Sequence, residues 1–272
     1  MNIISDNVKR IAGAQKRLGQ NFILDMNITR KIVNFSDLDQ ESTVLEIGPG
    51  PGGLTLAILE KSPLKLIVIE KDERCLEGLE LIKQTYSNSV QFDMVHGDAL
   101  SVIKNILADL CGVIIIANLP YNIASPLLVG FVHQHKHIKK MILMFQQEVA
   151  QRIVGKVGTN HYGRLSIIVQ AFFKPTIVYK LPPSAFTPPP KIHSAVVSFE
   201  PLVSGEDVNI KSLEEVTSLF FSHRRKTVGH IIKKYCQKQS SNIEEFLNPY
   251  LNLRPENLSV EVYTHLAQIF KK

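Results

Sequence analysis

An amide, a proline-linked carbonyl and an aromatic ring stand together in the tetrapeptide Asn118-Leu119-Pro120-Tyr121, directly after the apolar run of residues 113–117. An asparagine side-chain oxygen and the carbonyl before a proline are both hydrogen-bond acceptors, and a tyrosine ring can stack on a flat base. These groups suit a site that holds an amine-bearing base and directs its nitrogen. The commoner meaning of such residues is a strand that ends in an ordinary turn, so the tetrapeptide alone leaves both interpretations open.

A second candidate site is the glycine-rich segment of residues 48–53, which lies between a predicted strand and a predicted helix. Glycines let the backbone turn sharply and approach a ligand closely. Their spacing departs from the G-x-G-x-x-G pattern of dinucleotide sites, and Pro51 removes one backbone donor near the loop. A ligand without phosphates therefore fits this segment better than a dinucleotide does.

Two acidic residues follow the next two predicted strands. Glu70 lies about 20 residues beyond the glycine segment, where an acid can bind ribose hydroxyls, and Asp98 can accept a hydrogen bond from an adenine amino group. Taken singly, Glu70 could be a solvated strand end and Asp98 a helix N-cap. Since the carboxyl ends of parallel strands meet at one edge of a sheet, the glycine segment and the two acids together outline a nucleoside pocket.

Apolar runs that are typical of strands alternate with helix-like segments through the first two-thirds of the chain. We expect strands at residues 43–47, 65–70, 91–95, 113–118 and 140–146, with helices at residues 54–60, 73–84 and 125–134. This order predicts an α/β fold with a parallel sheet and helices on both faces. Later strands at residues 176–180 and 195–200 predict an antiparallel edge, and the proline-rich residues 181–190 between them predict a rigid loop.

The pattern changes after residue 200. Helices are expected at residues 213–221, 227–236, 243–247 and 260–270, with loop signals between them. We therefore expect two domains: residues 1–200 form the ligand-binding domain with a basic N-terminal arm, and residues 201–272 form a small helical domain.

Composition favours a soluble protein with a polyanionic partner. The hydrophobic fraction is 44%, no apolar run is long enough to cross a membrane, and the three scattered cysteines fit a reducing compartment. We expect a cytoplasmic protein. The net charge of +6 is uneven: residues 1–31 carry +4, residues 32–150 carry −5, residues 151–200 carry +5 and residues 201–272 carry +2. Basic segments around an acidic ligand-binding core suit a nucleic-acid enzyme, although unevenly spread surface lysines give the same pattern.

The chain resembles the ribosomal RNA adenine dimethylases, most closely the branch that acts on small-subunit ribosomal RNA. The matching segments span the chain from the N-terminal arm into the helical domain. They are residues 15–22 (QKRLGQNF), 45–50 (LEIGPG), 68–70 (VIE), 97–99 (GDA), 118–123 (NLPYNI), 145–150 (FQQEVA), 183–191 (P-x-x-F-x-P-x-P-K) with 194–196 (SAV), and 221–227 (F-x-x-RRKT).

The resemblance implies a Rossmann-like class I S-adenosylmethionine-dependent methyltransferase fold with a C-terminal helical RNA-binding domain. It implies N6,N6-dimethylation of two adjacent adenosines in a hairpin near the 3′ end of small-subunit ribosomal RNA, with a role in subunit biogenesis. The implied substrate is this RNA or an immature small subunit, and a monomer is expected by analogy. The implied cofactor contacts are Asn21, Ile23, Gly48, Glu70, Asp98 and Asn118. At position 23 the family usually has leucine, and a backbone contact should survive this difference.

For the chemistry, we hypothesise that the Asn118 side-chain oxygen and the Leu119 carbonyl accept the two amine hydrogens, which directs the nitrogen lone pair at the methyl group. Tyr121 is expected to stack on one face of a base taken out of its stack and Phe186 on the other. The alternative for Phe186 is a core aromatic under the proline-rich loop. Pro120 completes the predicted catalytic set.

Two further clusters have alternative interpretations. The cations at residues 224–226 predict an RNA contact, and the alternative is a solvated helix start. Residues 15–20 predict an arm that becomes ordered over the substrate, and the alternative is a loose tail. The motif His133-x-His135-x-His137 has no cysteine or carboxylate nearby to complete a zinc set, so no metal is expected.

Three other functions compete with the one that the resemblance implies. One is the related dimethylase of large-subunit ribosomal RNA that confers antibiotic resistance, which the segment at residues 224–227 and the Phe186 loop disfavour. Another is a nicotinamide-dependent oxidoreductase, which the imperfect glycine pattern disfavours. The last is an RNA-binding assembly factor without catalysis, against which the intact Glu70, Asp98 and Asn118 argue.

Overall fold

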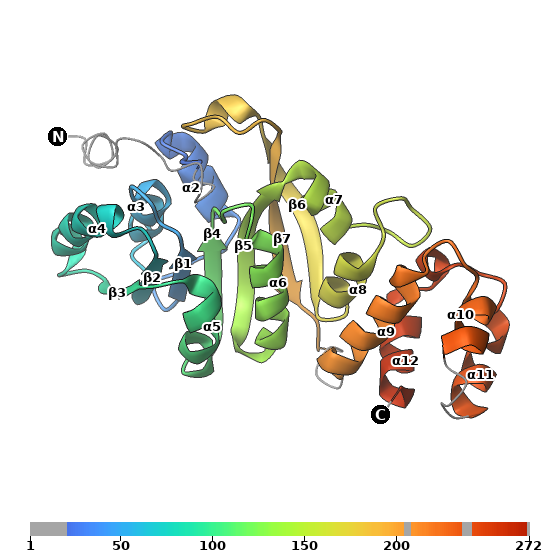
Figure 1. Cartoon of the computed structure of the whole chain (residues 1–272). Helices are drawn as coiled ribbons and strands as arrows, with labels where there is room; N and C mark the ends of the chain where they lie inside the picture. Colours follow the sequence, from blue (N-terminus) through green and yellow to red (C-terminus); the bar gives the residue numbers. More distant parts are fainter. Residues whose placement is uncertain (1–20, 204–207, 236–240, 271–272) are drawn as a thin grey trace. The chain divides into compact units, whose positions relative to one another are not determined.

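The computed structural model describes residues 21–203, 208–235 and 241–270 (Figure 1). The chain forms two compact units. The first comprises the residues up to 150 together with residues 176–200, and the second comprises residues 151–175 together with those from 201 onward. The predicted boundary at residue 200 therefore differs from this division: residues 151–175 group with the C-terminal helices and not with the sheet.

A seven-stranded mixed sheet in the order β3-β2-β1-β4-β5-β7-β6 positions the candidate site. Strands β1 to β5 are parallel, and β7 is antiparallel to β5, which confirms the predicted parallel sheet and the antiparallel strand near its edge. The strands are β1 (Thr43–Ile47), β2 (Lys65–Glu70), β3 (Gln91–His96), β4 (Val113–Ala117), β5 (Ile138–Gln146), β6 (Phe173–Leu181) and β7 (Ser194–Pro201).

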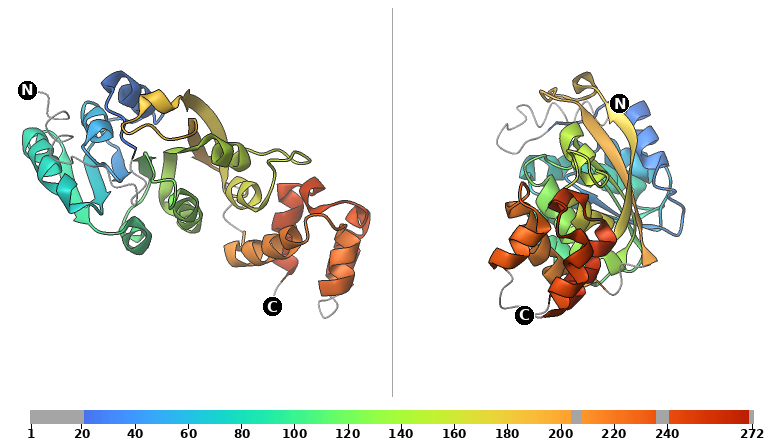
Figure 2. Two further views of the ribbon diagram at one scale, coloured as in Figure 1. Left: turned by 45° about the horizontal axis from the view of Figure 1, so that its top comes forward. Right: turned by 90° about the vertical axis from the view of Figure 1, so that its right-hand side faces the viewer.

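Helices cover both faces of the parallel strands, because these strands are apolar on both sides. Every residue of β4 is buried, as expected for a central strand of a parallel sheet. Val44 of β1 and Ile116 of β4 join one core cluster with α2 (Met26–Asn34), α3 (Gly53–Leu59) and α4 (Glu73–Tyr86). Helices α5 (Ala99–Ala108) and α6 (Ala124–His133) pack against each other, and they lie on the opposite side of the strands from α2 (Figure 2).

The sequence pattern missed four helices. Helix α2 begins at an Asp25 N-cap and α5 at an Asp98 N-cap, and such caps are weak signals by themselves. The other two, α7 (Gln147–Ile153) and α8 (Arg164–Gln170), have seven residues each, so a window of apolar periodicity is too short to reveal them. No helix in the described ranges is long and apolar enough to cross a lipid bilayer.

The second unit is helical, as predicted for the residues after 200. It contains α9 (Ile210–Ser222), α10 (Val228–Tyr235), α11 (Ser241–Leu247) and α12 (Val260–Ile269). Helix α8 packs against both α9 and α12, and α9 packs against α12. These contacts explain why residues 151–175 belong to this unit: four of the seven residues of α8 are buried, and the helical unit supplies the partners that they need.

Candidate active site

A pocket lies at the carboxyl ends of β1, β2, β3 and β4, where the sequence predicts a nucleoside site. Eight of the residues named from the sequence line it: Asn21, Gly48, Glu70, Asp98, Asn118, Leu119, Pro120 and Tyr121. The cavity and its open mouth together hold about 850 Å³ of empty space, part of which is open solvent.

The glycine-rich loop of residues 48–53 reaches the pocket in a backbone conformation that requires glycine. Gly50 has φ = +55°, and a Cβ atom there would lie 2.6 Å from Cε1 of the Phe22 ring. Both its conformation and its close approach to Phe22 therefore exclude other residues at this position. Phe22 belongs to the family segment at residues 15–22, but local spacing does not reveal its role, because that role depends on a contact with Gly50, 28 positions away.

Glu70 is a buried carboxylate that already accepts three backbone hydrogen bonds. Gly50 N donates to Oε2 at 3.0 Å, and the backbone N–H groups of Lys71 and Asp72 both donate to Oε1 at 2.8 Å. Burial raises the pKa of Glu70, and these hydrogen bonds oppose the rise. A carboxylate has about four lone-pair sites, so Glu70 keeps acceptor capacity for a ribose hydroxyl while it holds the glycine-rich loop in place.

Asp98 is the N-cap of α5, which is one of the two roles that the sequence left open, and its contact with an adenine amino group stays a prediction. Its Oδ1 caps α5 by accepting from Leu100 N at 3.0 Å, and its Oδ2 accepts from Lys71 Nζ at 2.7 Å. The Lys71 ammonium, together with the cap, lowers the pKa of Asp98. The group is therefore ionised and can only accept hydrogen bonds. Lys71 lines the pocket as well, and the sequence offered only its place after Glu70 as a signal.

The Asn118 amide has a fixed orientation. Its Nδ2 donates to the backbone carbonyl of Asn21 at 2.7 Å. Because a carbonyl oxygen can only accept, the NH₂ group must face Asn21, and Oδ1 is left to accept from another molecule. Among the described residues, neither Oδ1 of Asn118 nor the Leu119 carbonyl receives a hydrogen bond. The two acceptors named from the sequence are thus both available at the exit of β4.

Tyr121 lines the pocket, whereas Phe186 does not. The Tyr121 hydroxyl lies 2.6 Å from Oγ of Ser194. Phe186 is only 3% exposed and belongs to the apolar core cluster. The structure thus supports the core-aromatic interpretation of Phe186, and its stacking on a base stays a prediction. Ile23 is also absent from the pocket lining: it is 6% exposed, and its backbone carbonyl lies against Gly53.

Glu46 is a buried carboxyl that does not line the pocket. Glu46 of β1 is 1% exposed, and Thr55 of α3 donates its hydroxyl to Glu46 Oε2 at 2.7 Å. Burial raises the pKa of Glu46 to about 8, which the Thr55 hydrogen bond opposes and the charge of Glu70 reinforces. The sequence placed Glu46 in a family motif and assigned it no role.

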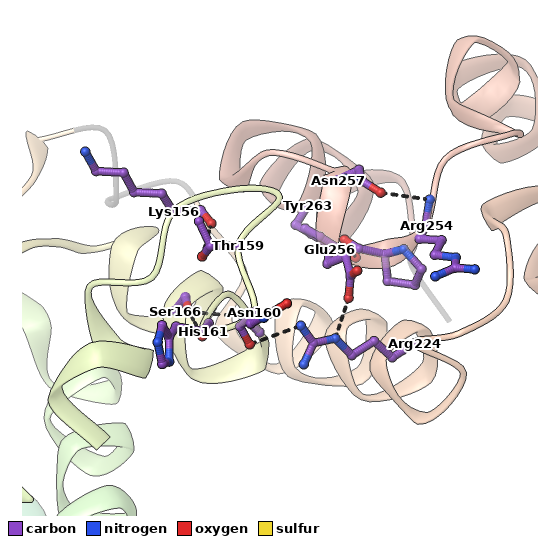
Figure 3. Close-up of polar contacts among 12 residues, drawn as sticks. Lys156, Thr159, Asn160, His161, Ser166, Arg224, Arg254, Glu256, Asn257 and Tyr263 are labelled. Carbon is purple, nitrogen blue, oxygen red and sulfur yellow. Dashed lines mark hydrogen bonds and ion pairs between the residues drawn. The ribbon is translucent and has the colours of Figure 1, made fainter. Parts of the chain in front are cut away.

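The cations at residues 224–226 do not share one role. Arg224 donates from Nε to Glu256 Oε2 at 2.5 Å and from Nη2 to the Asn160 carbonyl at 3.2 Å (Figure 3). The RNA contact of these three cations stays a prediction, and Arg224 differs from the other two because it already has two partners within the chain. Arg225 and Lys226 are exposed and make no ion pair within the described part of the chain.

The histidines of the His133-x-His135-x-His137 motif are not arranged around a common point. His135 Nδ1 lies 3.0 Å from the Val132 carbonyl, and His137 Nδ1 lies 2.7 Å from the Leu110 carbonyl. In the ranges that the structure describes, no group of three or more His, Cys, Asp or Glu side chains could hold a metal ion.

The Rossmann-like sheet, the pocket at its carboxyl edge and the tetrapeptide after β4 define a methyltransferase fold. Residues 11–272 match the family described as ribosomal RNA adenine dimethylase, and the chain belongs to that family. It is therefore an enzyme that dimethylates adenine in ribosomal RNA. This result excludes the nicotinamide-dependent oxidoreductase that the glycine-rich segment had left open.

Individual relatives agree with the family. The chain is 39% identical to ribosomal RNA small subunit methyltransferase A of Chelativorans sp. over 262 residues, which cover 94% of this chain and 92% of the relative. It is 42% identical to the protein of the same name from Sinorhizobium medicae over 257 residues, covering 93% and 92%. A crystal structure of a dimethyladenosine transferase from Plasmodium falciparum superimposes with a TM-score of 0.80 at 27% identity, covering 90% of this chain and 95% of that one.

Proposed function

We propose that this enzyme binds S-adenosylmethionine in the pocket and dimethylates N6 of two adjacent adenosines in a hairpin near the 3′ end of small-subunit ribosomal RNA. The fixed Asn118 amide carries the proposal, because its orientation leaves Oδ1 beside the Leu119 carbonyl as a pair of acceptors for one amino group. The small-subunit target is supported by relatives named small subunit methyltransferase A that cover nearly the whole chain.

The chemistry of the pocket residues fits this cofactor. Glu70 retains acceptor capacity for the ribose hydroxyls, and Asp98 is an ionised acceptor for the adenine amino group of the cofactor. Carboxylates gather along the lining at Glu70, Asp72 and Asp98, which suits a ligand with a cationic sulfonium and opposes the phosphates of a dinucleotide. When bound, S-adenosylmethionine supplies an electrophilic methyl carbon.

The tetrapeptide then acts on the substrate amine. An exocyclic amine shares its lone pair with the ring, so it is a weak nucleophile while planar. Asn118 Oδ1 and the Leu119 carbonyl accept its two hydrogens, which favours a pyramidal nitrogen and directs its lone pair toward the methyl carbon. The N–C bond forms as the S–C bond breaks, and the methylated nitrogen then loses a proton to water. No strong base is needed, because the nitrogen becomes acidic only after it has gained the methyl group.

Tyr121 holds the base during this reaction. Its ring lines the pocket next to the two acceptors, and stacking on an aromatic face is the usual way to hold a base that has left its helix. The second transfer requires the monomethylated amine to turn and re-enter, so the site must accept one methyl substituent. The exposed Arg225 and Lys226 are the candidates for contacts with RNA phosphates in the helical unit. Methylation of an immature subunit would make the enzyme part of small-subunit biogenesis.

Mapping the methylated base tests the proposal. The purified protein is incubated with labelled S-adenosylmethionine and unmethylated small or large ribosomal subunits, and the labelled nucleotides are located by primer extension and mass spectrometry. We expect N6,N6-dimethyladenosine at two adjacent positions in the 3′ hairpin of the small-subunit RNA. Label confined to a single adenosine of the large-subunit RNA would instead identify the enzyme as the resistance type.

A further inference from the structure

Tyr121 is hydrogen-bonded through its side chain to a distant strand. In the described part of the chain, no other residue of the tetrapeptide Asn118-Leu119-Pro120-Tyr121 has such a bond. Its hydroxyl lies 2.6 Å from Oγ of Ser194, which is 73 positions later in the chain. The tyrosine ring is therefore attached at two ends: the backbone beyond β4 carries its Cα, and Ser194 holds its hydroxyl. Ring faces remain for stacking, while the hydroxyl is already committed to another partner.

Ser194 is a rigid support. It is the first residue of β7, it is fully buried at 0% exposure, and it is paired with Gln146 at the end of β5. Next to it, Gln147 N donates to the His193 carbonyl at 2.9 Å. The sheet fixes the backbone on both sides of Ser194 and therefore the position of its Cβ, and the contact with Tyr121 selects the rotamer of its hydroxyl.

The Ser194 hydroxyl is a polar group next to buried apolar residues of β7. The residues that follow Ser194 are Ala195, Val196 and Val197, and all three are buried. An alanine at position 194 would therefore fit the strand, so packing alone gives no reason for a serine. The hydrogen bond to Tyr121 provides that reason, because it gives the partly buried tyrosine hydroxyl a partner within the protein.

We propose that Ser194 is a positioning residue for catalysis, which fixes the plane of the Tyr121 ring so that the substrate adenine is held with its amino group at Asn118 and Leu119. Preorganised binding surfaces of this kind raise the rate because the productive geometry does not have to be selected from several ring orientations. The inference rests on the proposed function, since it assigns Ser194 to the step in which the base is held.

A double-mutant cycle tests the proposal. The four proteins are the wild type, Ser194→Ala, Tyr121→Phe and the double variant, and the quantities measured are kcat and KM with unmethylated small subunits and the Kd for S-adenosylmethionine. Both single variants remove the same hydrogen bond and keep the ring. We therefore expect each to lower kcat/KM by roughly 5- to 30-fold, and the double variant to be no slower than the slower single variant. The Kd for S-adenosylmethionine should stay within about twofold of the wild type.

A matched control comes from the same strand. Ser198 of β7 lies four positions from Ser194, so it is on the same face of the strand. It is also buried, at 6% exposure, and it makes no side-chain hydrogen bond with the described residues. The Ser198→Ala variant should keep the kcat/KM of the wild type, which separates loss of the Tyr121 contact from a general effect of removing a buried hydroxyl from β7.

A binding readout separates this inference from the proposed function. An RNA hairpin that carries 2-aminopurine at the target adenosine loses fluorescence when the base stacks on a tyrosine ring. We expect quenching with the wild type and Ser198→Ala and weaker quenching with Ser194→Ala. The proposal is overturned if the losses from Ser194→Ala and Tyr121→Phe multiply in the double variant, or if Ser194→Ala keeps wild-type turnover and quenching. If the wild type itself neither methylates small subunits nor quenches the probe, the proposed function fails instead.

Discussion

At the scale of single residues, the active site depends on groups whose hydrogen bonds are already partly used. Glu70 holds the glycine-rich loop with part of its acceptor capacity, and Asp98 caps α5 while Lys71 keeps it ionised. Asn118 uses its NH₂ group within the fold, and in the proposed function its oxygen accepts from the substrate amine. Each side chain therefore reaches the pocket in a geometry that the protein fixes before any ligand arrives, which is the condition for catalysis by positioning.

Glu46 gives a prediction about pH and stability. Its pKa of about 8 in the folded state lies above the ordinary value of 4.5, so the folded protein binds an extra proton between these pH values. The contribution of Glu46 to the unfolding free energy is therefore complete below about pH 4.5 and is lost as the pH rises through 8. Over this range the unfolding free energy falls by up to about 1.4 kcal/mol per pH unit. In Glu46→Gln this dependence should disappear, because glutamine keeps the acceptor for Thr55 and does not titrate.

Urea unfolding of both proteins at a series of pH values between 4.5 and 9 measures this difference. The unfolding free energy of Glu46→Gln relative to the wild type should rise steadily with pH over that range. Parallel stability curves for the two proteins would show that Glu46 ionises normally, and the buried position of its carboxyl would then need another explanation.

At the scale of elements, the sheet was predictable and several helices were not. Strands such as β1 and β2 have the predicted limits, because buried parallel strands form apolar runs that stand out from the rest of the sequence. Helix α8 escaped prediction since its residues are buried mainly by helices of its own unit, and such a short segment has no clear amphipathic pattern. The group of acids at the strand ends was predictable for the same topological reason as the sheet.

Contacts between distant segments were the part of the site that the sequence could not reveal. The hydrogen bond from Asn118 to Asn21 joins residues 97 positions apart, and the contact of Phe22 with Gly50 depends on how the chain before α2 crosses the glycine-rich loop. Neither contact follows from local spacing. Likewise, the motif around Phe186 identified an important residue without showing whether its ring lies in the core or in the pocket.

A substitution of Phe186, in the proline-rich loop before β7, separates a role in the apolar core from a role in stacking on the base. Because Phe186 is buried in the apolar core, Phe186→Leu should lower the unfolding free energy by about 1 kcal/mol or more, while kcat/KM per folded molecule stays close to that of the wild type. Thermal unfolding and turnover measured on the same preparation check both statements. A large loss of turnover with unchanged stability would restore the base-stacking role that the motif implies.

At the scale of the whole molecule, the two units differ in the kind of interaction that they offer. The sheet unit contains the acidic pocket, and residues 32–150 carry a net charge of −5. Residues 151–175 and 201–272, which form the helical unit, are both basic, with +4 and +2. In the proposed function, these charges of opposite sign serve to attract RNA phosphates to the basic segments and a cationic cofactor to the pocket.

The paired and free cations of the helical unit should respond differently to mutation. Arg224 joins the turn after α9 to Glu256 and to the loop at Asn160. Arg224→Ala should therefore lower the melting temperature by a few degrees and leave the salt dependence of RNA binding unchanged. Arg225→Ala should keep the melting temperature and reduce the slope of log K against log salt by about one, as expected for one lost phosphate contact.

Glu256→Gln provides the matched control, because it weakens the same ion pair without removing a cation. It should reproduce the lower melting temperature of Arg224→Ala. If Arg224→Ala instead reduced the salt slope at an unchanged melting temperature, Arg224 would belong to the RNA contacts together with Arg225.

The most direct test of the account is the single-turnover rate of methyl transfer by Asn118→Ala, measured beside its Kd for S-adenosylmethionine. If Oδ1 of Asn118 directs the amine of the substrate adenine, the rate should fall roughly 10²- to 10³-fold, while the cofactor still binds through Glu70 and Asp98 with moderately reduced affinity. A near-normal rate in this variant would contradict the account, because the pair of acceptors after β4 would then play no part in the reaction.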